Sequence, residues 1–431
     1  MSHPTDPKDS TAPGRAYYTL AILFVVYIFN FVDRQILSVL LVPIKAELGA
    51  SDTGMGFLTG FAFALFYTTA GIPIARLADR TSRTTIIAAG LVVWSGMTAV
   101  SGLARSFAQL AIARVLVGVG EAAASPAAHS LISDYFPAAR RATALAVYTM
   151  GANVGILLGL AGGGWLAQYF GWRAAFYVVG LPGLVMAAIV WLTLEEPPRG
   201  AADAATPVED EPMPSTGEVL RHLWGLRSFR HLTIAGGIYA LAGYGFMTWV
   251  PAFLSRVHGL SIGEAGTWAG IMIGGGGALG AFLGGQLCDR LAPRDVRWQM
   301  WVPALGGLLI VPFGLGFVLI DDLTLALCLY APAAVAGSFY VGPTFAVTQA
   351  LAKLRMRALA AAIVLFALNL VGLGLGPVAI GFANDMLAPT LGDAAVRYSL
   401  AVALLTNLLA LAHSLMASRT LKDDLDRVGG A

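Results

Sequence analysis

Charged side chains inside apolar segments are the residues of this 431-residue chain most able to do chemistry. Asp33 and Arg34 are neighbours within an apolar run over residues 17–41, and Arg114 and Glu121 lie in a second such run. A charged side chain near the centre of a bilayer costs roughly 2.5–3.5 kcal/mol on insertion scales. A buried carboxyl group can take up and release a proton, and a buried arginine can hold an anion. The two pairs therefore suggest proton-coupled or anion-binding chemistry within a membrane.

The spacing of these residues restricts how they can face one another. Arg114 and Glu121 are seven residues apart, which places them on one face of a helix about two turns apart. Asp33 and Arg34 differ by about 100° in direction, so one can face the second helix while the other faces elsewhere. We expect Arg34 or Arg114 to pair with Glu121, and Asp33 to take up and release a proton. The alternative is a static structural ion pair.

The composition indicates that these segments lie in lipid. The chain is 57% hydrophobic and 12% charged, whereas soluble domains carry about 25% charged residues. The net charge of +2 gives no indication of a nucleic-acid partner, and none is expected. Two cysteines predict no disulfide framework. We expect neither a metal nor a bound cofactor, with protons as the coupling ion, the bilayer as surroundings and a monomer as the working form.

The apolar segments predict an all-α membrane protein with twelve spans in two six-helix halves. A polar stretch rich in Pro, Ala, Asp and Glu separates the halves, and we expect one short amphipathic helix within it. The predicted parts are an N-terminal tail (1–16), a first bundle (17–194), a linker (195–230), a second bundle (231–418) and a C-terminal tail (419–431). The predicted spans are 17–41, 54–76, 84–104, 107–133, 141–169, 174–194, 231–256, 264–287, 300–320, 323–352, 356–383 and 394–418.

The distribution of basic residues predicts the orientation. The two termini, the linker and the loops on their side carry 20 of the 27 lysines and arginines. The loops on the opposite side carry five, which are Lys45, Arg105, Arg173, Arg256 and Arg397. Cytoplasmic loops are enriched in Lys and Arg. Both termini and the linker are therefore predicted to be cytoplasmic. The absence of a long targeting segment fits a multi-pass protein of the bacterial inner membrane, which is the expected location.

A short charged motif occurs after the second and the eighth predicted span. The pattern Leu-x-Asp-Arg followed by another arginine recurs 210 residues apart, measured between Asp79 and Asp289. The repeat indicates that one half duplicates the other. Carboxylates flanked by guanidinium groups at helix ends can form a charge network that closes one side of a transporter. We expect a cytoplasmic gate made of Asp79, Arg80, Arg83, Asp289, Arg290 and Arg294.

The twelve-span layout and the duplicated loop resemble the Major Facilitator Superfamily. The segment from Arg114 to Gly120, Arg-Val-Leu-Val-Gly-Val-Gly, resembles the family's Arg-x-x-x-Gly-x-Gly motif. A ladder of Gly151, Gly155 and Gly159 resembles the fifth-helix motif of its antiporters without the Gly-Pro pair. The resemblance implies a central cavity lined by the first and fourth spans, with transport by alternating access.

A narrower set of motifs looks like the spinster subfamily, mainly over the first half. These motifs are Asn30-Phe31-Val32-Asp33-Arg34, Gly118-Val119-Gly120-Glu121-Ala122, Asp134-Tyr135-Phe136-Pro137 and Phe170-Gly171-Trp172-Arg173. The resemblance implies secondary active transport of lysolipid-like or sphingolipid-like amphiphiles, often with proton coupling. Asp33 and Glu121 are then the candidate proton-coupling residues, and Arg34 and Arg114 the candidate cavity charges.

The second half contributes mainly neutral candidates. Asn369 precedes a glycine-rich stretch and is the one we expect to face substrate. A channel would need a continuous polar lining, but the intramembrane charges cluster in the first half. An enzyme would need a nucleophile–base pair or a metal cluster, and no such spacing occurs. The remaining alternatives are a multidrug/proton antiporter and an organic-anion or sugar-phosphate carrier.

Overall fold

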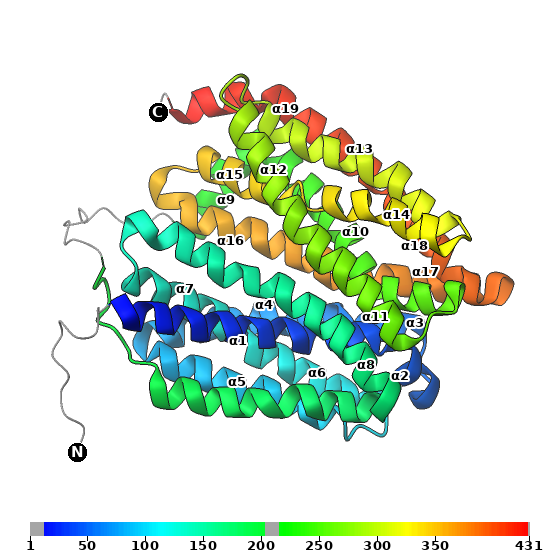
Figure 1. Ribbon diagram of the computed structural model, residues 1–431. Helices are drawn as coiled ribbons and strands as arrows, with labels where there is room; N and C mark the ends of the chain where they lie inside the picture. The colour runs from blue at the N-terminus through cyan, green and yellow to red at the C-terminus, as the bar shows by residue number, and fades with distance from the viewer. Residues whose placement is uncertain (1–12, 203–214, 430–431) are drawn as a thin grey trace, which may run out of the picture. The chain divides into compact units, whose positions relative to one another are not determined.

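The computed structural model describes residues 13–202 and 215–429, which form helices, turns and loops without a strand (Figure 1). Ten helical stretches in this part are long and apolar enough to cross a membrane. One stretch, Ala138–Thr193, has 56 residues, or about 84 Å, far more than a hydrocarbon core of about 30 Å. It turns at Gly171 (φ 82°, ψ 160°), and the stretch Leu359–Val428 turns at Gly392 (φ 54°). With these two stretches counted twice, the helices give the twelve predicted spans.

The chain divides into two compact units whose boundaries do not follow its halves. Among the described residues, the first unit contains 13–50, 62–202 and 262–270. The second unit contains 51–61, 215–261 and 271–429. Residues 51–61 of the first half thus belong to the second unit, and residues 262–270 of the second half belong to the first. We call these two stretches the exchanged segments.

Glycines allow the helices of the first unit to pack closely. A Cβ atom on Gly155 would lie 2.6 Å from the Cβ of Phe31, and one on Gly151 would lie 2.9 Å from the carbonyl oxygen of Phe24. Because side chains there would clash with α1, the glycine ladder sets the approach of α1 and α8. The helices are α1 (Pro13–Val39), α2 (Leu41–Leu48), α4 (Phe61–Arg80, which begins in the second unit), α5 (Arg83–Ser101), α6 (Phe107–Glu121), α7 (Ala124–Tyr135), α8 (Ala138–Thr193) and α11 (Ile262–Gly270).

The second unit includes the predicted amphipathic helix of the linker. This helix, α9 (Thr216–Gly225), begins with a capping box between Ser215 and Glu218 and buries Val219 and Leu223. The other elements are α3 (Asp52–Thr59), α10 (Arg227–His258), η1 (Ile271–Gly276), α12 (Gly277–Leu291), α13 (Trp298–Leu319), α14 (Leu323–Ala336), α15 (Val341–Leu351), η2 (Leu354–Met356), α16 (Arg357–Ala367), η3 (Leu368–Leu375), α17 (Gly376–Leu391), η4 (Gly392–Ala394), α18 (Ala395–Leu405) and α19 (Asn407–Gly429). The final helix continues through most of the predicted C-terminal tail.

The exchanged segments pack against their host units through backbone contacts at glycines. A Cβ on Gly266 in α11 would lie 2.2 Å from the carbonyl oxygen of Leu160 in α8. In the second unit, a Cβ on Gly56 in α3 would lie 2.3 Å from the carbonyl oxygen of Pro377 in α17. Larger residues could not approach so closely. A π-helical segment, η1, directly follows α11 at the point where the chain enters the second unit, and such segments often mark functional bends.

Candidate functional site

The first unit contains a buried cluster of four charged residues, two on α1 and two on α6. Arg34 on α1 donates to Glu121 on α6, with Nη2 2.6 Å and Nε 3.2 Å from the same oxygen, Oε2. Glu121 is fully buried, and the side chain of Arg34 is 10% exposed. Of the two expected partners for Glu121, the structure therefore shows Arg34 in the pair. We call Asp33, Arg34, Arg114 and Glu121 the charge cluster.

Asp33 takes no part in this ion pair and is fully buried. Arg114 donates from Nη1 to the backbone carbonyl of Asp33 at 3.1 Å rather than to its carboxyl group. Neither carboxyl oxygen of Asp33 has a hydrogen-bond partner in the described part of the chain, and the same holds for Oε1 of Glu121. An ionised carboxylate in an apolar interior is costly without such partners. The site is therefore suited to a carboxyl group that can be neutral.

Aromatic rings surround the guanidinium group of Arg34. Its Cζ lies 4.6 Å from the ring centroid of Phe63, 4.8 Å from that of Phe31 and 5.4 Å from that of Tyr67. Cations are attracted to ring faces at such distances. The partly exposed side of the cluster thus combines a cation with flat apolar surface, which could hold an anionic group attached to an apolar body.

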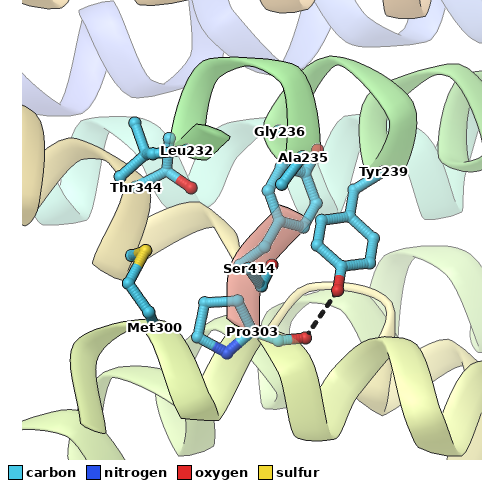
Figure 2. A pocket seen from close by; sticks show the side chains of 9 residues that line it. Leu232, Ala235, Gly236, Tyr239, Met300, Pro303, Thr344 and Ser414 are labelled. Carbon is cyan, nitrogen blue, oxygen red and sulfur yellow. Dashed lines mark hydrogen bonds between the residues drawn. The ribbon is translucent and has the colours of Figure 1, made fainter. Parts of the chain in front are cut away.

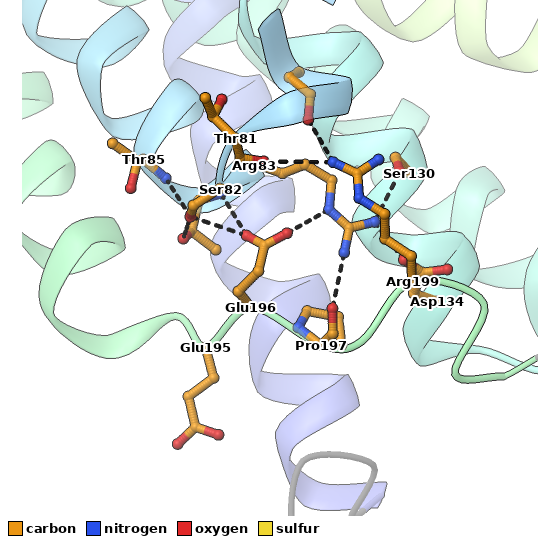
Figure 3. A network of polar contacts seen from close by, with 12 residues as sticks. Thr81, Ser82, Arg83, Thr85, Ser130, Asp134, Glu195, Glu196, Pro197 and Arg199 are labelled. Carbon is orange, nitrogen blue, oxygen red and sulfur yellow. Dashed lines mark hydrogen bonds and ion pairs between the residues drawn. The ribbon is translucent and has the colours of Figure 1, made fainter. Parts of the chain in front are cut away.

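One of the predicted gate residues, Arg83, lies at the centre of a buried polar network at the start of α5 (Figure 3). Its guanidinium group donates to Glu196 at 2.6 Å, to Ser130 at 2.8 Å and to the carbonyl of Pro197 at 3.0 Å, and it also pairs with Asp134. The start of the linker is therefore held on the first unit. The repeated charged motif predicted a role for Arg83 but none for Glu196, whose only signal in the sequence is a pair of glutamates directly after a span.

The other predicted gate residues have different surroundings. Arg80, Asp289, Arg290 and Arg294 are exposed, and the structure shows no ion pair for them in the part that it describes. The side chain of Asp79 lies outside the described part. The gating role of this group stays a prediction.

The second unit contains the neutral candidate Asn369 and one small cavity. Asn369 lies within the π-helical segment η3 and is partly exposed. A cavity of about 10 Å³ is lined by side chains that include Tyr239, Tyr340 and Thr344, and Tyr239 donates to the carbonyl of Pro303 at 2.9 Å (Figure 2). This volume holds about one water molecule. The cavity is too small for an organic substrate.

A second buried polar cluster, which no sequence motif predicted, lies in the second unit. Asp52 at the start of α3 pairs with Arg256 on α10 through two bonds of 2.5 and 2.9 Å, and it accepts from Asn384 on α17 at 3.1 Å. Asp385 accepts from the backbone N–H groups of Asp52 (3.0 Å) and Thr53 (2.7 Å). We call these residues the Asp52 clasp. It fastens the exchanged segment α3 to α10 and α17.

Glu47 on α2 accepts from two residues of the Phe-Gly-Trp-Arg motif in the first unit. Trp172 donates from Nε1 at 2.6 Å and Arg173 donates from Nη1 at 2.5 Å. The hydrogen bond from Trp172, followed by that from Arg173, lowers the pKa of Glu47 below its ordinary value. Gly171, with its positive φ, allows the turn that directs both side chains toward Glu47.

Comparison with known proteins places the chain in a family of transporters. Residues 23–377 match the family model of the Major Facilitator Superfamily. An MFS-type efflux pump of Mycolicibacterium smegmatis is 37% identical over 396 residues, covering 92% of this chain and 91% of that protein. A D-galactonate transporter of Escherichia coli is 28% identical, covering 98% and 99%.

The fold has a similar solved counterpart. The crystal structure of a bacterial homologue of the human lysosomal transporter spinster, inward-facing and unoccupied, superposes with a TM-score of 0.89 at 32% identity. The match covers 96% of this chain and 99% of that one. This chain belongs to the Major Facilitator Superfamily, whose members are multi-pass membrane proteins that act as secondary transporters rather than enzymes.

Proposed function

We propose that this protein is a spinster-type transporter that moves a single-chain amphiphile of the lysolipid or sphingolipid class and is driven by protons. The observation that carries the proposal is the charge cluster. Both carboxyl oxygens of the buried Asp33 lack a partner among the described residues, and Asp33 adjoins an Arg34–Glu121 pair that lies among aromatic rings. One part of the cluster suits proton exchange, and the other suits an anionic head group with an apolar tail.

Proton binding can be coupled to substrate binding because Arg34 can pair either with Glu121 or with an anionic head group. While Arg34 pairs with Glu121, the charge on Glu121 is neutralised. An anionic head group that recruits Arg34 would leave Glu121 buried without its partner, and a proton would then compensate. Asp33 lies next along α1, so a movement of α1 against α6 changes the surroundings of both carboxyl groups together. Proton and substrate are thereby linked through one helix pair. The match to the spinster homologue, over nearly the whole chain, supports the spinster-type assignment, and the substrate class is the one that the spinster motifs imply.

We propose a bacterial inner-membrane location with both termini cytoplasmic, which the basic-residue distribution and the bacterial relatives support. The predicted gate fits this orientation, since the Arg83 network holds the start of the cytoplasmic linker.

A second candidate is a carrier of small hydrophilic organic anions. The full-length similarity to a D-galactonate transporter favours it. Arg34 could bind a sugar-acid carboxylate directly. This candidate assigns no role to the aromatic rings around Arg34.

The two candidates are separated by a thermal-shift panel followed by uptake into proteoliposomes. The panel contains lysophosphatidic acid, lysophosphatidylcholine, sphingosine-1-phosphate, galactonate, glucarate and a lipophilic cation. The proposal predicts stabilisation by the single-chain lipids and little by the sugar acids. Stabilisation by galactonate alone, with galactonate accumulation under a pH gradient, would refute the lipid assignment.

A further inference from the structure

Helix α5 contains buried polar side chains that have no role in the coupling proposed above. Trp94, Ser95 and Thr98 are fully buried. The indole nitrogen of Trp94 and the hydroxyl groups of Ser95 and Thr98 have no hydrogen-bond partner among the described residues. Most buried polar groups are paired, and leaving one unpaired costs free energy. Three unpaired groups within two turns of one helix therefore need an explanation.

Thr98 lies beside the carboxyl group of Asp33, but the neighbouring hydroxyl group of Ser95 points elsewhere. The carboxyl of Asp33 and the hydroxyl of Thr98 are neighbours between α1 and α5. A Cβ on Gly183 of α8 would lie 2.0 Å from the oxygen of Ser95, so Ser95 faces α8. Both hydroxyl groups are unpaired, but of the two Thr98 is the one placed beside the carboxyl group.

The hydroxyl proton of Thr98 is not engaged by its own helix. Helical threonines commonly donate to the carbonyl four residues earlier. Thr68 does so to Ala64 at 2.6 Å, and Thr348 does so to Thr344 at 2.7 Å. Thr98 makes no such bond in the described structure. Its hydroxyl group can therefore rotate to donate to an ionised carboxylate or accept from a protonated one.

The charged groups around Asp33 come from two helices. Glu121 and Arg114, both on α6, act on its carboxyl group, and Arg34 on its own helix is held by Glu121. The charged residues of α8 are Arg140, Arg141 and Arg173, which lie at its start and at the turn. Arg114 binds the backbone of Asp33 instead of the carboxyl oxygens. Thr98 is thus well placed to act as a direct hydrogen-bond donor to Asp33.

We propose that Thr98 is a positioning residue for proton exchange. Its hydroxyl group donates to the Asp33 carboxylate when the proton leaves, and it thereby sets the pH at which Asp33 binds its proton. The inference rests on the proposed proton role of Asp33. A hydrogen bond to an ionised group is worth more than one to a neutral group, so the hydroxyl favours the ionised form overall. Its removal should make Asp33 hold its proton to higher pH.

The test is pH-difference infrared spectroscopy on the full-length protein in liposomes. A protonated carboxyl group gives a carbonyl stretching band, and the Asp33 band is the one that disappears in Asp33→Asn. Thr98→Val replaces the hydroxyl by a methyl group of similar size. In this variant the midpoint pH at which the Asp33 band titrates should move upward by about one to two pH units. Thr98→Ser should stay within a few tenths of a unit of the wild type. If Thr98→Val does not fold, Thr98→Ala carries the same expectation.

Ser95→Ala is the matched control, because it removes an unpaired, fully buried hydroxyl group one turn away that faces α8. In Ser95→Ala the midpoint pH of the Asp33 band should be the same as in the wild type. A midpoint in Thr98→Val that equals the wild type or lies below it would overturn the proposal, and so would an equal shift in Ser95→Ala. If no band disappears in Asp33→Asn, the proton role of Asp33 fails instead, so the two failures are distinguishable.

Discussion

The charge cluster of the first unit and the Asp52 clasp of the second are both built on a buried arginine–carboxylate pair, but they differ in how the other polar atoms are satisfied. In the clasp, both carboxyl oxygens of Asp52 accept hydrogen bonds, and two backbone N–H groups of α3 are bound by Asp385. The atom of the clasp without a partner among the described residues is a neutral one, Oδ1 of Asn384. In the charge cluster, both oxygens of Asp33 and one oxygen of Glu121 have no partner in the described structure.

The difference indicates that the Asp52 clasp holds helices in one arrangement, whereas the charge cluster can change its protonation or its partner. Carboxylates whose oxygens all accept hydrogen bonds, as those of Asp52 and Asp385 do, favour one geometry, because a rearrangement leaves charged atoms unpaired. Carboxyl oxygens without a partner, as in Asp33 and Glu121, are open to a proton. We therefore expect disruption of the charge cluster to alter coupling as well as stability, and disruption of the clasp to alter the packing of α3 while leaving proton binding intact.

The largest effect is expected from Arg34→Met, which leaves Glu121 fully buried without its cation. Breaking a buried pair from one side costs about 3–5 kcal/mol. The free energy of unfolding, measured in lipid–detergent micelles, should fall by that amount. The double variant Arg34→Met/Glu121→Gln should recover most of the loss, because no uncompensated charge remains. If the free energy of unfolding of Arg34→Met lay within about 1 kcal/mol of the wild-type value, Glu121 would already be protonated in the resting protein.

A smaller loss is expected from Arg256→Met in the clasp. Asp52 keeps the hydrogen bond from Asn384, so we expect about 2–3 kcal/mol. The infrared midpoint of Asp33 should stay at its wild-type value. Arg419→Met, an exposed arginine on α19, is the control and should change stability by less than about 0.5 kcal/mol. A shifted Asp33 midpoint in Arg256→Met would contradict the claim that the clasp is independent of proton binding at the charge cluster.

Gly381→Ala tests how tightly the clasp depends on backbone contact. A Cβ at this position would lie 2.3 Å from the carbonyl oxygen of Asp52, so α3 and α17 must separate. Overpacking of this kind costs about 1–3 kcal/mol. Gly243→Ala on α10 meets no atom within 4 Å and should be neutral or slightly stabilising. Equal melting temperatures for the two variants would contradict the predicted close contact.

The smallest effect on stability is expected at Glu47. This carboxylate is exposed, so its contribution can be compared with those of the buried ion pairs. Trp172 and Arg173 lower its folded-state pKa below the ordinary 4.5. Its contribution to stability is therefore present above the unfolded-state pKa and is lost as pH falls through the folded-state pKa. The stabilities of wild type and Glu47→Gln should differ slightly at neutral pH and converge in acid. A difference that grows in acid would contradict this sign.

The sequence was sufficient to predict the twelve-span fold and the membership of the charge cluster. Charges in apolar runs are rare, and helical geometry predicted that Asp33 and Arg34 point in different directions. It could not decide between Arg34 and Arg114 as the partner of Glu121. That choice depends on the rotation of α1 against α6, which places Arg114 at the backbone of Asp33.

The clasp and the exchanged segments could not be predicted because their signals are not local. Asp52 looks like an ordinary first-turn residue after the helix cap Ser51, and Asp385 is 333 residues away from it. Only the arrangement of helices brings them together. Glu196 was likewise assigned to a linker, although it binds the buried Arg83.

The most direct test of the central claim is Asp33→Asn in proteoliposomes, with the lipid that gives the largest wild-type thermal shift as the labelled substrate. Two modes are measured side by side: accumulation driven by a pH gradient, and counterflow exchange without a gradient. We predict that accumulation is lost while counterflow persists, because the variant can still alternate but cannot carry the proton. Accumulation at the wild-type level would contradict the claim that Asp33 couples protons to transport.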